Sequence, residues 1–399
     1  MTTSSLDHST ANDPAAALLP LVGVRVVEFC TTASGPFSTM LLSDMGAEVV
    51  KIEPPTGDGL RQWPPLNQGY SENFASLNRN KRSAVLNLKD PQDVALARRL
   101  ILEADVLVEN NRPGVMDRLG LGYAALSAEK PGLLFCSISA YGQSGPRSSE
   151  GGFDLTIQAA AGVMSVTGEP SGAPVKCGVP LSDFASGLYA AFSIAAMLVH
   201  VRSGGRGAHI DIPMFGCTLG IAALQTSEYF GNGRSPVKLG SAHPRNAPYQ
   251  AFQAQDGYFA IAAGNHKLWL DVLRVVDLPA LAEDPRFIST TDRAHNQEAL
   301  KQLLEAVFTR QPVAHWIAAF NDAGVPHARI NDYAAALSDP QTAHMGWVQP
   351  LELPGGQLTR TFGSPVRLNG KGFPIRRSPP ALGQHSDEIR AEYAQKEGS

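Results

Sequence analysis

Apolar runs of strand length alternate with helix-like stretches through the first half of the chain. Residues 24–29 and 47–53 are rich in Val and Ile, and the segment between them carries Pro36 near its start and Gly46 at its end. Proline suits the first turn of a helix and glycine suits its end, so the pattern predicts a strand–helix–strand unit and favours a parallel sheet. Further strands are expected at residues 84–88, 105–109 and 133–139, with a helix at 91–103. The first half is therefore predicted to be an α/β domain whose ligand loops follow the carboxyl ends of its strands.

The pattern changes near residue 241. Two short strands, at 249–252 and 258–262, are followed by amphipathic helices at 268–276, 295–309 and 313–323, which predicts a smaller α+β domain. The expected division is a disordered lead-in at 1–20, a large α/β domain at 21–215, a linker at 216–240, a small domain at 241–335 and a C-terminal return onto the large domain at 336–399.

One uncharged run, residues 184–201, is long enough to raise the question of a membrane span. It is rich in alanine and other small residues, and no second run of this kind occurs. We therefore expect a buried core helix, followed by a strand at 209–213, and no membrane partner.

Composition limits the classes of function. The 399 residues carry a net charge of −4, with 18% charged and 43% hydrophobic residues, which argues against a nucleic-acid partner. The four cysteines show no C-x-x-C spacing and residues 1–14 contain no basic stretch, so we expect a cytoplasmic protein with reduced thiols. No group of His, Cys, Asp and Glu has the spacing of metal ligands, so no metal site is predicted.

Polar and basic residues recur directly after the predicted strands. The turn after the first strand, residues 30–35, lacks the G-x-G-x-x-G spacing of a dinucleotide site. Basic side chains at strand ends suit a ligand with phosphates and an adenine, although solvated surface charge explains each residue alone equally well. The residues concerned are Lys81, Arg82, Lys89, Asn110, Asn111, Arg112 and Arg118.

A lone carboxylate, Asp183, follows a Pro- and Gly-rich loop and opens the long apolar run. Unpaired backbone N–H groups and the helix dipole favour negative charge there, and the amides beyond Asp183 are candidate oxyanion donors. An N-cap is the alternative, because Asp is among the residues preferred at that position. Asp211 is a candidate partner for Asp183, although a surface strand explains it as well. His243 and His266 alone suggest surface or packing residues.

Motifs spread over residues 21–388 resemble those of the class III coenzyme A transferases, a family that also includes the α-methylacyl-CoA racemases. No single motif is specific, whereas the combination is highly specific. The matching segments are Gly35-Pro36, Gly46 to Glu53, Asn80 to Ser83, Asn110 with Pro113-Gly114, Asp117 to Gly120, Tyr141-Gly142, Gly145-Pro146, Thr167-Gly168, the block around Asp183, Gly205 to Gly207, Pro248-Tyr249, Asp256-Gly257 and Gly383 to His385.

The resemblance implies a Rossmann-like large domain and a smaller domain, in a homodimer whose two chains interlock like links. It also implies that Asp183 is the nucleophile. The implied substrates are an acyl-CoA thioester and a free carboxylic acid, with no permanently bound cofactor. The implied CoA contacts are Thr32, Ala33, Leu86, Asn87, Lys89, Asn110, Asn111, Arg112 and Arg118.

Departures from the family patterns indicate which branch of the family the chain belongs to and how large its acyl group is. Phe153 stands where the racemases have a histidine, and because phenylalanine cannot move a proton, transfer is favoured. The loop at residues 239–245 replaces a run of glycines in formyl-CoA transferases, and Pro54 replaces an arginine, so an acyl group larger than formyl or oxalyl is expected. The candidate substrate contacts in this loop are Ser241, His243 and Arg245.

The resulting prediction is a CoA-transferase with succinyl-CoA as the donor and a small dicarboxylic or hydroxy-dicarboxylic acid as the acceptor. Two alternatives stay open. One is an acyl-CoA racemase or isomerase in which Asp183 acts only as an acid or base. The other is a non-catalytic CoA-binding subunit in which Asp183 is only an N-cap.

Overall fold

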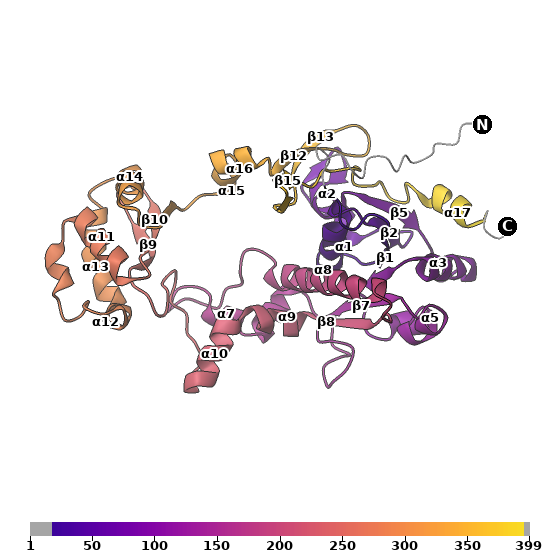
Figure 1. Ribbon diagram of the computed structural model, residues 1–399, viewed down its shortest axis with the longest axis horizontal. Helices are drawn as coiled ribbons and strands as arrows, with labels where there is room; N and C mark the ends of the chain where they lie inside the picture. The colour runs from indigo at the N-terminus through magenta and orange to yellow at the C-terminus, as the bar shows by residue number, and fades with distance from the viewer. Residues whose placement is uncertain (1–17, 395–399) are drawn as a thin grey trace. The chain divides into compact units, whose positions relative to one another are not determined.

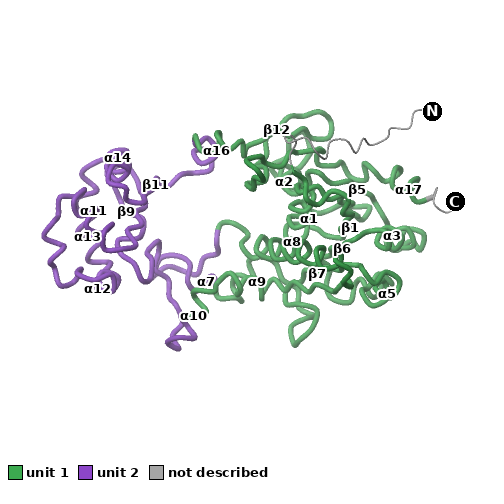
Figure 2. The backbone as a smooth tube through the Cα atoms, in the orientation of Figure 1, with its two compact units in different colours: residues 1–162, 178–227, 340–399 green, residues 163–177, 228–339 purple. Residues whose placement is uncertain are grey.

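The computed structural model describes residues 18–394, so most of the predicted lead-in at 1–20 lies outside the described residues. The chain forms two compact units, coloured green and purple in Figure 2. Unit 1 comprises residues 1–162, 178–227 and 340–399, and unit 2 comprises residues 163–177 and 228–339. The domain boundaries expected at 215, 240 and 335 stay predictions.

Unit 1 is built on a six-stranded sheet of order β5-β2-β1-β6-β7-β8, in which every neighbouring pair is parallel. The predicted α/β class with a parallel sheet is confirmed. The chain runs outward from β1 to β5, returns to the other side of β1 at β6 and continues outward to β8. Strand order therefore reverses between β1 and β6, the place where doubly wound sheets bind ligands. The strands are β1 Arg25–Phe29, β2 Glu48–Glu53, β5 Lys81–Val85, β6 Val106–Glu109, β7 Leu134–Ser139 and β8 His209–Pro213.

Helices cover both faces of this sheet (Figure 1). Helices α1 (Ser34–Asp44) and α8 (Leu181–Arg202) pack on one face, and α3 (Pro91–Glu103) and α17 (Ser386–Ala394) pack on the other. Val26 points into the first of these cores and Val27 into the second, as expected for neighbouring residues of a strand. Because both faces are covered, the central strands β1, β6 and β7 have mostly apolar sequences without strict alternation.

The strand predicted at residues 84–88 is wrong in position. Strand β5 covers Lys81–Val85, and residues 86–89 form the turn before α3. Lys81 is fully buried at the start of this strand, with its ammonium paired to Glu28, so its charge hides the strand from a search for apolar runs. Helix α3, by contrast, has its predicted bounds, because Asp90 caps it and a proline occupies its first position.

Helix α8 is long, as predicted, but it is buried on one face only. A Cβ added to Gly187 would come within 2.8 Å of the carbonyl oxygen of Ser34, so small residues let α8 pack closely on α1. On the opposite face Leu188, Phe192 and Val199 are exposed by 54%, 71% and 67%. Among the described residues, α8 is the one helix long and apolar enough to cross a membrane.

Unit 2 contains a three-stranded antiparallel sheet of order β11-β10-β9, and its predicted hairpin is confirmed. The helix predicted at 295–309 is confirmed as α13, which covers Gln297–Phe308. A separate short helix, α12, precedes it and ends at His295, and the Asn296 side-chain amide between the two helices donates to the Asp292 carbonyl. Aromatic side chains fill the core of the unit, with Phe308 in contact with Phe252 and Phe259. The elements are β9 Tyr249–Gln253, β10 Tyr258–Ala262, α11 His266–Val276, α12 Thr290–His295, α13 Gln297–Phe308, α14 Val313–Ala323 and β11 His327–Arg329.

The remaining described elements are mostly short. In unit 1 they are η2 Gly59–Gln62, β3 Leu66–Asn67, β4 Tyr70–Ser71, α2 Glu72–Asn78, α4 Val115–Arg118, α5 Tyr123–Glu129, α6 Asp154–Ala160, α9 Met214–Ile221, α16 Pro340–Met345, β12 Val348–Glu352, β13 Leu358–Phe362, β14 Arg367–Leu368 and β15 Lys371–Gly372. In unit 2 they are α7 Val163–Val166, η3 Pro279–Ala282 and α15 Tyr333–Leu337, and α10 Ala223–Asn232 crosses the boundary between the units.

Candidate active site

A cavity of about 250 Å³ lies within unit 1 at the carboxyl ends of β1 and β6. Parallel strands place their following loops at one edge of the sheet, and the reversal of strand order between β1 and β6 separates these two loops enough to leave a crevice. The cavity is lined by Thr31, Thr32, Ala33, Ser34, Asn110, Asn111, Arg112, Pro113, Ile138, Ser139, Ala140, Glu150, Gly151, Gly152, Phe153, Asp183 and Met214.

Six of the residues predicted from the sequence line this cavity together: Thr32, Ala33, Asn110, Asn111, Arg112 and Asp183. Four other predicted CoA contacts, Leu86, Asn87, Lys89 and Arg118, are not part of its lining. Leu86 is buried in the core, so only its backbone is available to a ligand, and Asn87 accepts a hydrogen bond from the backbone N–H of Lys89. Arg118 ends the short helix α4. The CoA-binding role of all these residues stays a prediction.

Two reciprocal hydrogen bonds join the loop after β1 to the loop after β6. The backbone N–H of Thr31 donates to Asn110 Oδ1 at 3.0 Å, and Asn110 Nδ2 donates to the Thr31 carbonyl at 2.8 Å. Sequence analysis singled out Asn110 but missed Thr31, although its position directly after a strand is a usable signal. The pair fixes the distance between the two loops that form the cavity.

Asp183 occupies the first turn of α8. The helix begins at Leu181 with Pro180 at the N-cap position, so the hypothesis that Asp183 is the N-cap is wrong. The expected oxyanion donors are also incorrect for the next residue, because the amide of Phe184 is bonded to the Pro180 carbonyl. Within residues 18–394 the Asp183 carboxyl has no hydrogen-bond partner, and it lines the cavity with its oxygens uncommitted.

A second carboxylate, Asp154, lies close to Asp183. Asp154 Oδ1 accepts from the backbone N–H of Ser182 at 2.9 Å, and its Oδ2 accepts from Gln158 Nε2 at 2.8 Å. The predicted partner, Asp211, is instead committed to the backbone N–H of Gln143 and does not line the cavity. Sequence analysis missed Asp154, although its position shortly after Gly151-Gly152 is a usable signal.

Burial, and to a smaller extent the neighbouring charge of Asp154, raises the pKa of Asp183 to about 7. Both causes act against the charged form, since burial removes water from the carboxylate and a like charge repels it. An ionised Asp183 is therefore poorly solvated and unpaired, which suits a nucleophile or a general base.

The rest of the cavity lining is mostly uncharged. Arg112 is the one Lys or Arg among the described lining residues, and it provides planar donors suited to a phosphate. Glu150 also lines the cavity and is paired with Arg147 at 2.7 Å. Phe153 presents an exposed apolar ring to the cavity. No three His, Cys, Asp or Glu side chains are grouped to hold a metal ion in the described part of the chain.

The three candidate substrate contacts belong to unit 2, where internal hydrogen bonds order their loop. His243 Nδ1 accepts from the backbone N–H groups of Arg245 and Asn246, both at 3.1 Å, and its ring stacks on Tyr249. Burial, and then the charge of Arg245, lowers the pKa of His243, consistent with a neutral acceptor ring. Ser241 Oγ accepts from the N–H of Ala251.

Arg245 is not free in this loop. Its guanidinium pairs with Glu228 at 3.2 Å, and both side chains are partly exposed. Any role of Arg245 in holding a substrate carboxylate therefore requires an exchange of partner, which costs little for an exposed ion pair.

Residues 21–386 match the family model described as CoA-transferase family III. The chain is 39% identical to the acetyl-CoA:oxalate CoA-transferase of Acetobacter aceti, with 97% of this chain and 99% of that protein covered. It is 36% identical to the succinyl-CoA:glutarate CoA-transferase of Homo sapiens, with 94% and 86% covered. The fold is similar to the crystal structure of a CAIB/BAIF family protein from Brucella suis, with a TM-score of 0.83, 36% identity, and 94% and 99% of the two chains covered.

Proposed function

Since this chain belongs to CoA-transferase family III and is a CoA-transferase, we propose that it moves CoA from succinyl-CoA to a small dicarboxylic or hydroxy-dicarboxylic acid, with Asp183 as the nucleophile. One observation carries the role of Asp183: its carboxyl is shielded, has no hydrogen-bond partner within the described residues and lines the cavity. The same cavity brings together most of the predicted CoA contacts.

The reaction consists of acyl exchanges on the Asp183 carboxyl. The carboxylate attacks the thioester carbonyl, the C–S bond breaks, and a mixed anhydride and the CoA thiolate form. The thiolate then attacks the aspartyl carbonyl, which releases the donor acid as its carboxylate and leaves an Asp183–CoA thioester. The acceptor carboxylate attacks this thioester to give a new anhydride and free thiolate. Attack of the thiolate on the acceptor acyl group yields the product and restores the Asp183 carboxylate.

No proton has to be gained or lost in this cycle, so the protein chiefly positions the reactants. Correct orientation of bound groups is worth effective molarities of roughly 10⁵–10⁸ M. The anhydride is sensitive to water, so a shielded Asp183 protects it. Asp183 must be ionised to attack, and the pKa of about 7 keeps a large ionised fraction available at neutral pH.

CoA contacts are proposed along the carboxyl edge of the sheet. The loops after β1 and β6 present Thr32, Ala33, Asn110 and Asn111 beside Asp183, and Arg112 supplies the positive charge for a phosphate. The segment 86–89 follows β5 at the same edge, because all these strands are parallel. Leu86, Asn87, Lys89 and Arg118 therefore complete the proposed set away from the cavity.

The dicarboxylate acceptor is supported by the names of two relatives, whose acceptors are glutarate and oxalate. The expectation of an acyl group larger than oxalyl agrees with glutarate and not with oxalate. We assign the distal carboxylate to the loop with Ser241, His243 and Arg245, in which Arg245 is the cation. Replacement Arg245→Ala is expected to reduce the preference for dicarboxylic over monocarboxylic acceptors. An unchanged preference in a panel of oxalate, succinate, glutarate, malate and butyrate would remove this loop from the proposal.

The racemase hypothesis has one observation in its favour, since a carboxyl with a pKa near 7 also suits a general base. Against it, the position where racemases have a histidine holds Phe153, whose ring lines the cavity.

Mass spectrometry after incubation with succinyl-CoA distinguishes the transferase from the racemase hypothesis. A CoA-sized adduct on the peptide that contains Asp183, absent in Asp183→Asn and discharged by one acid, supports transfer and names the acceptor. Incorporation of solvent deuterium at Cα without an adduct or acyl exchange supports the racemase instead.

A homodimer in the cytoplasm completes the proposal. The exposed side chains of Leu188, Phe192 and Val199 form an apolar stripe on α8 that a second copy of the chain is proposed to cover. Replacement Phe192→Glu is expected to shift the mass measured by light scattering toward that of one chain. An unchanged dimer would exclude this stripe as its interface.

A further inference from the structure

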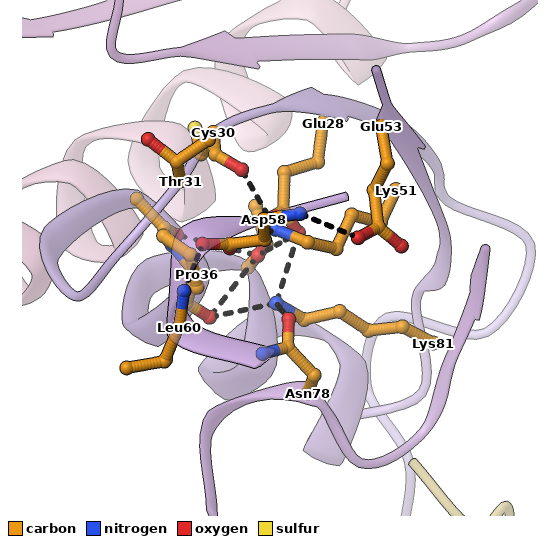
Figure 3. Close-up of polar contacts among 12 residues, drawn as sticks. Glu28, Cys30, Thr31, Pro36, Lys51, Glu53, Asp58, Leu60, Asn78 and Lys81 are labelled. Atoms are coloured by element: carbon orange, nitrogen blue, oxygen red, sulfur yellow. Dashed lines mark hydrogen bonds and ion pairs between the residues drawn. The ribbon is translucent and has the colours of Figure 1, made fainter. Parts of the chain in front are cut away.

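Beneath the loop that lines the cavity lies a set of charged side chains without solvent contact. We call Glu28, Lys51, Asp58 and Lys81 the buried charge cluster; they come from β1, β2, the segment after β2 and β5 (Figure 3). All four side chains are 0% exposed. Charges removed from water are tolerated only when they are fully paired, so their partners show what the cluster holds in place.

Lys51 has three close oxygen neighbours, and one of them belongs to the loop. Its ammonium donates hydrogen bonds to Glu28 Oε1 at 2.9 Å and to the Cys30 carbonyl at 2.7 Å, and it forms an ion pair with Asp58 Oδ2 at 3.0 Å, an oxygen that accepts no hydrogen bond within the described residues. Cys30 begins the loop that contributes Thr31 to Ser34 to the cavity. The charge of Lys51 thus fixes both the start of the loop and the orientation of Asp58.

Asp58 makes the second connection to the loop. While its Oδ2 pairs with Lys51, its Oδ1 accepts from the backbone N–H of Thr32 at 3.1 Å and of Leu60 at 2.9 Å. Asp58 itself does not line the cavity, whereas Thr32 does. The carboxylate therefore touches the binding surface only from behind.

Thr32 needs such support because of its backbone conformation. Its φ angle is +66°, a left-handed value that β-branched residues rarely adopt. A residue in this region keeps its conformation only when its surroundings enforce it. Two supports are present: the bond from Asp58 to the Thr32 amide, and the Asn110 side chain that pairs with Thr31.

The other lysine contacts the first turn of α1, the helix that follows the loop. Lys81 donates to the Pro36 carbonyl at 2.9 Å and to Asn78 Oδ1 at 3.0 Å, and it pairs with Glu28 Oε2 at 2.9 Å. Glu28 thus links the lysine at the start of the loop to the lysine at the helix that follows the loop. Apolar residues of similar volume stabilise a core as well as buried ion pairs do, so general stability alone does not explain these contacts.

We propose that Asp58 is a positioning residue for acyl-CoA: oriented by Lys51, it holds Thr32 in its left-handed conformation and so preforms the CoA-binding surface of the loop. The inference rests on the proposed function, in which Thr32 and Ala33 contact CoA. A preformed loop does not lose conformational freedom when the ligand binds. If the loop is no longer preformed, we expect the binding of acyl-CoA to weaken more than the chemical steps slow down.

Three variants test this inference. Asp58→Ala removes the ion pair with Lys51 and the bonds to the Thr32 and Leu60 amides, and Asp58→Asn keeps an oxygen for these amides while removing the charge. The matched control is Asp44→Asn, which disrupts another buried ion pair, between Asp44 and Arg79 at 2.6 Å, without touching the loop. All three are measured below the melting temperature of the least stable one.

For Asp58→Ala we expect the Kd for CoA, from calorimetry, and the KM for succinyl-CoA to rise by about 10-fold to 100-fold, with a smaller change in kcat. Amide hydrogen exchange of residues 30–36 is expected to become faster. Asp58→Asn should show smaller changes in the same direction, and it keeps the test available if Asp58→Ala does not fold. Asp44→Asn should lower the melting temperature and leave both CoA binding and loop exchange as in the wild type.

Wild-type CoA affinity and loop exchange in Asp58→Ala would overturn the inference, as would equal losses of affinity in Asp44→Asn. Failure of the proposed function is distinguishable from either result. In that case the wild-type protein itself forms no adduct on Asp183 and binds no CoA, while loop exchange still reports whether Asp58 orders Thr32.

Discussion

Glu28 and Asp183 are two carboxylates of unit 1 that are shielded from water to a large extent, and their surroundings are opposite. Glu28 is held between two lysines and accepts a further hydrogen bond from the Thr39 hydroxyl. Asp183 has no hydrogen-bond partner among the described residues, and its charged neighbour is another carboxylate, Asp154. Both carboxylates belong to unit 1, and both lie near the loop after β1.

The acidities of the two groups follow from this difference. Burial alone opposes ionisation of Glu28, yet Lys51 and Lys81 outweigh it and lower the pKa of Glu28 to about 2. Burial of Asp183 meets no opposing cation, so the pKa of Asp183 rises to about 7. The pairing of a shielded carboxylate, more than its burial, therefore decides whether it is a permanently charged structural group or a reactive one.

The comparison is tested most strongly by removing the reactive carboxylate. Replacement Asp183→Ala is expected to lower kcat for CoA transfer by roughly 10³-fold or more, because the covalent intermediates cannot form. Since the carboxyl has no hydrogen bond within the described structure, CoA affinity and the circular dichroism spectrum should stay near those of the wild type. Steady-state transfer from succinyl-CoA to glutarate measures the effect. Retention of a tenth of the wild-type rate would rule out Asp183 as the nucleophile.

Removal of the structural carboxylate should act on folding instead. Replacement Glu28→Gln leaves Lys51 and Lys81 without their shared counter-charge, and breaking a buried pair in this way costs about 3–5 kcal/mol of the free energy of unfolding. Urea denaturation at pH 7 measures the loss. The control is Arg245→Ala, whose pair with Glu228 is partly exposed and should cost less than about 1 kcal/mol. Equal losses in the two variants would mean that the buried charge cluster is no more tightly coupled than a surface pair.

The difference between the two carboxylates also marks how far the sequence alone leads. The parallel sheet and the bounds of α3 were predicted, because apolar runs and caps are local signals. The grouping of Asp183 with Asn110 to Arg112 was implied only by the resemblance to the family. The shift of β5 to Lys81–Val85 was not predicted, because a buried lysine resembles a surface lysine until its partner Glu28 is known. Pairings between distant segments leave no local pattern in one sequence.

The same limit applies around Asp183. Its role as a mere helix cap was a sound local hypothesis, yet the helix begins earlier, at Leu181. Asp154 became the neighbouring charge because α6 and α8 start near each other in space, which the spacing of 28 residues between Asp154 and Ser182 does not reveal. Comparison with the family pattern, and not the spacing, was what identified Asp183 as a nucleophile candidate.

The stability of Asp183→Asn as a function of pH sharpens the comparison further. The unfolded chain loses the Asp183 proton near pH 4, whereas the native chain holds it until about pH 7, so ionisation destabilises the native state as pH rises through this window. An amide does not titrate. Asp183→Asn should therefore be more stable than the wild type at pH 8, by on the order of 2–4 kcal/mol, and the difference should vanish near pH 4.

Chemical denaturation of both proteins at pH 4, 6 and 8 gives this difference directly. Ionisation of Glu28 has the opposite effect on the stability of the native state. Because the pKa of Glu28 is lowered, its ion pairs stabilise the native state above about pH 4.5, and this stabilisation is lost as the pH falls through about 2. A variant Asp183→Asn that is less stable than the wild type at pH 8 would show that the Asp183 carboxylate has a favourable partner after all.

The smallest expected effect separates the two causes that act on Asp183. Burial is the larger cause of its raised pKa and the charge of Asp154 the smaller, so Asp154→Asn should move the rising limb of the pH profile of kcat/KM to lower pH without restoring an ordinary aspartate. The asparagine keeps an oxygen for the Ser182 amide, so the start of α8 stays in place. The profile is measured from pH 5 to 9 with succinyl-CoA. A limb that moves to higher pH would mean that Asp154 supports the ionised form of Asp183 through the Ser182 contact, and an unmoved limb would assign the raised pKa to burial alone.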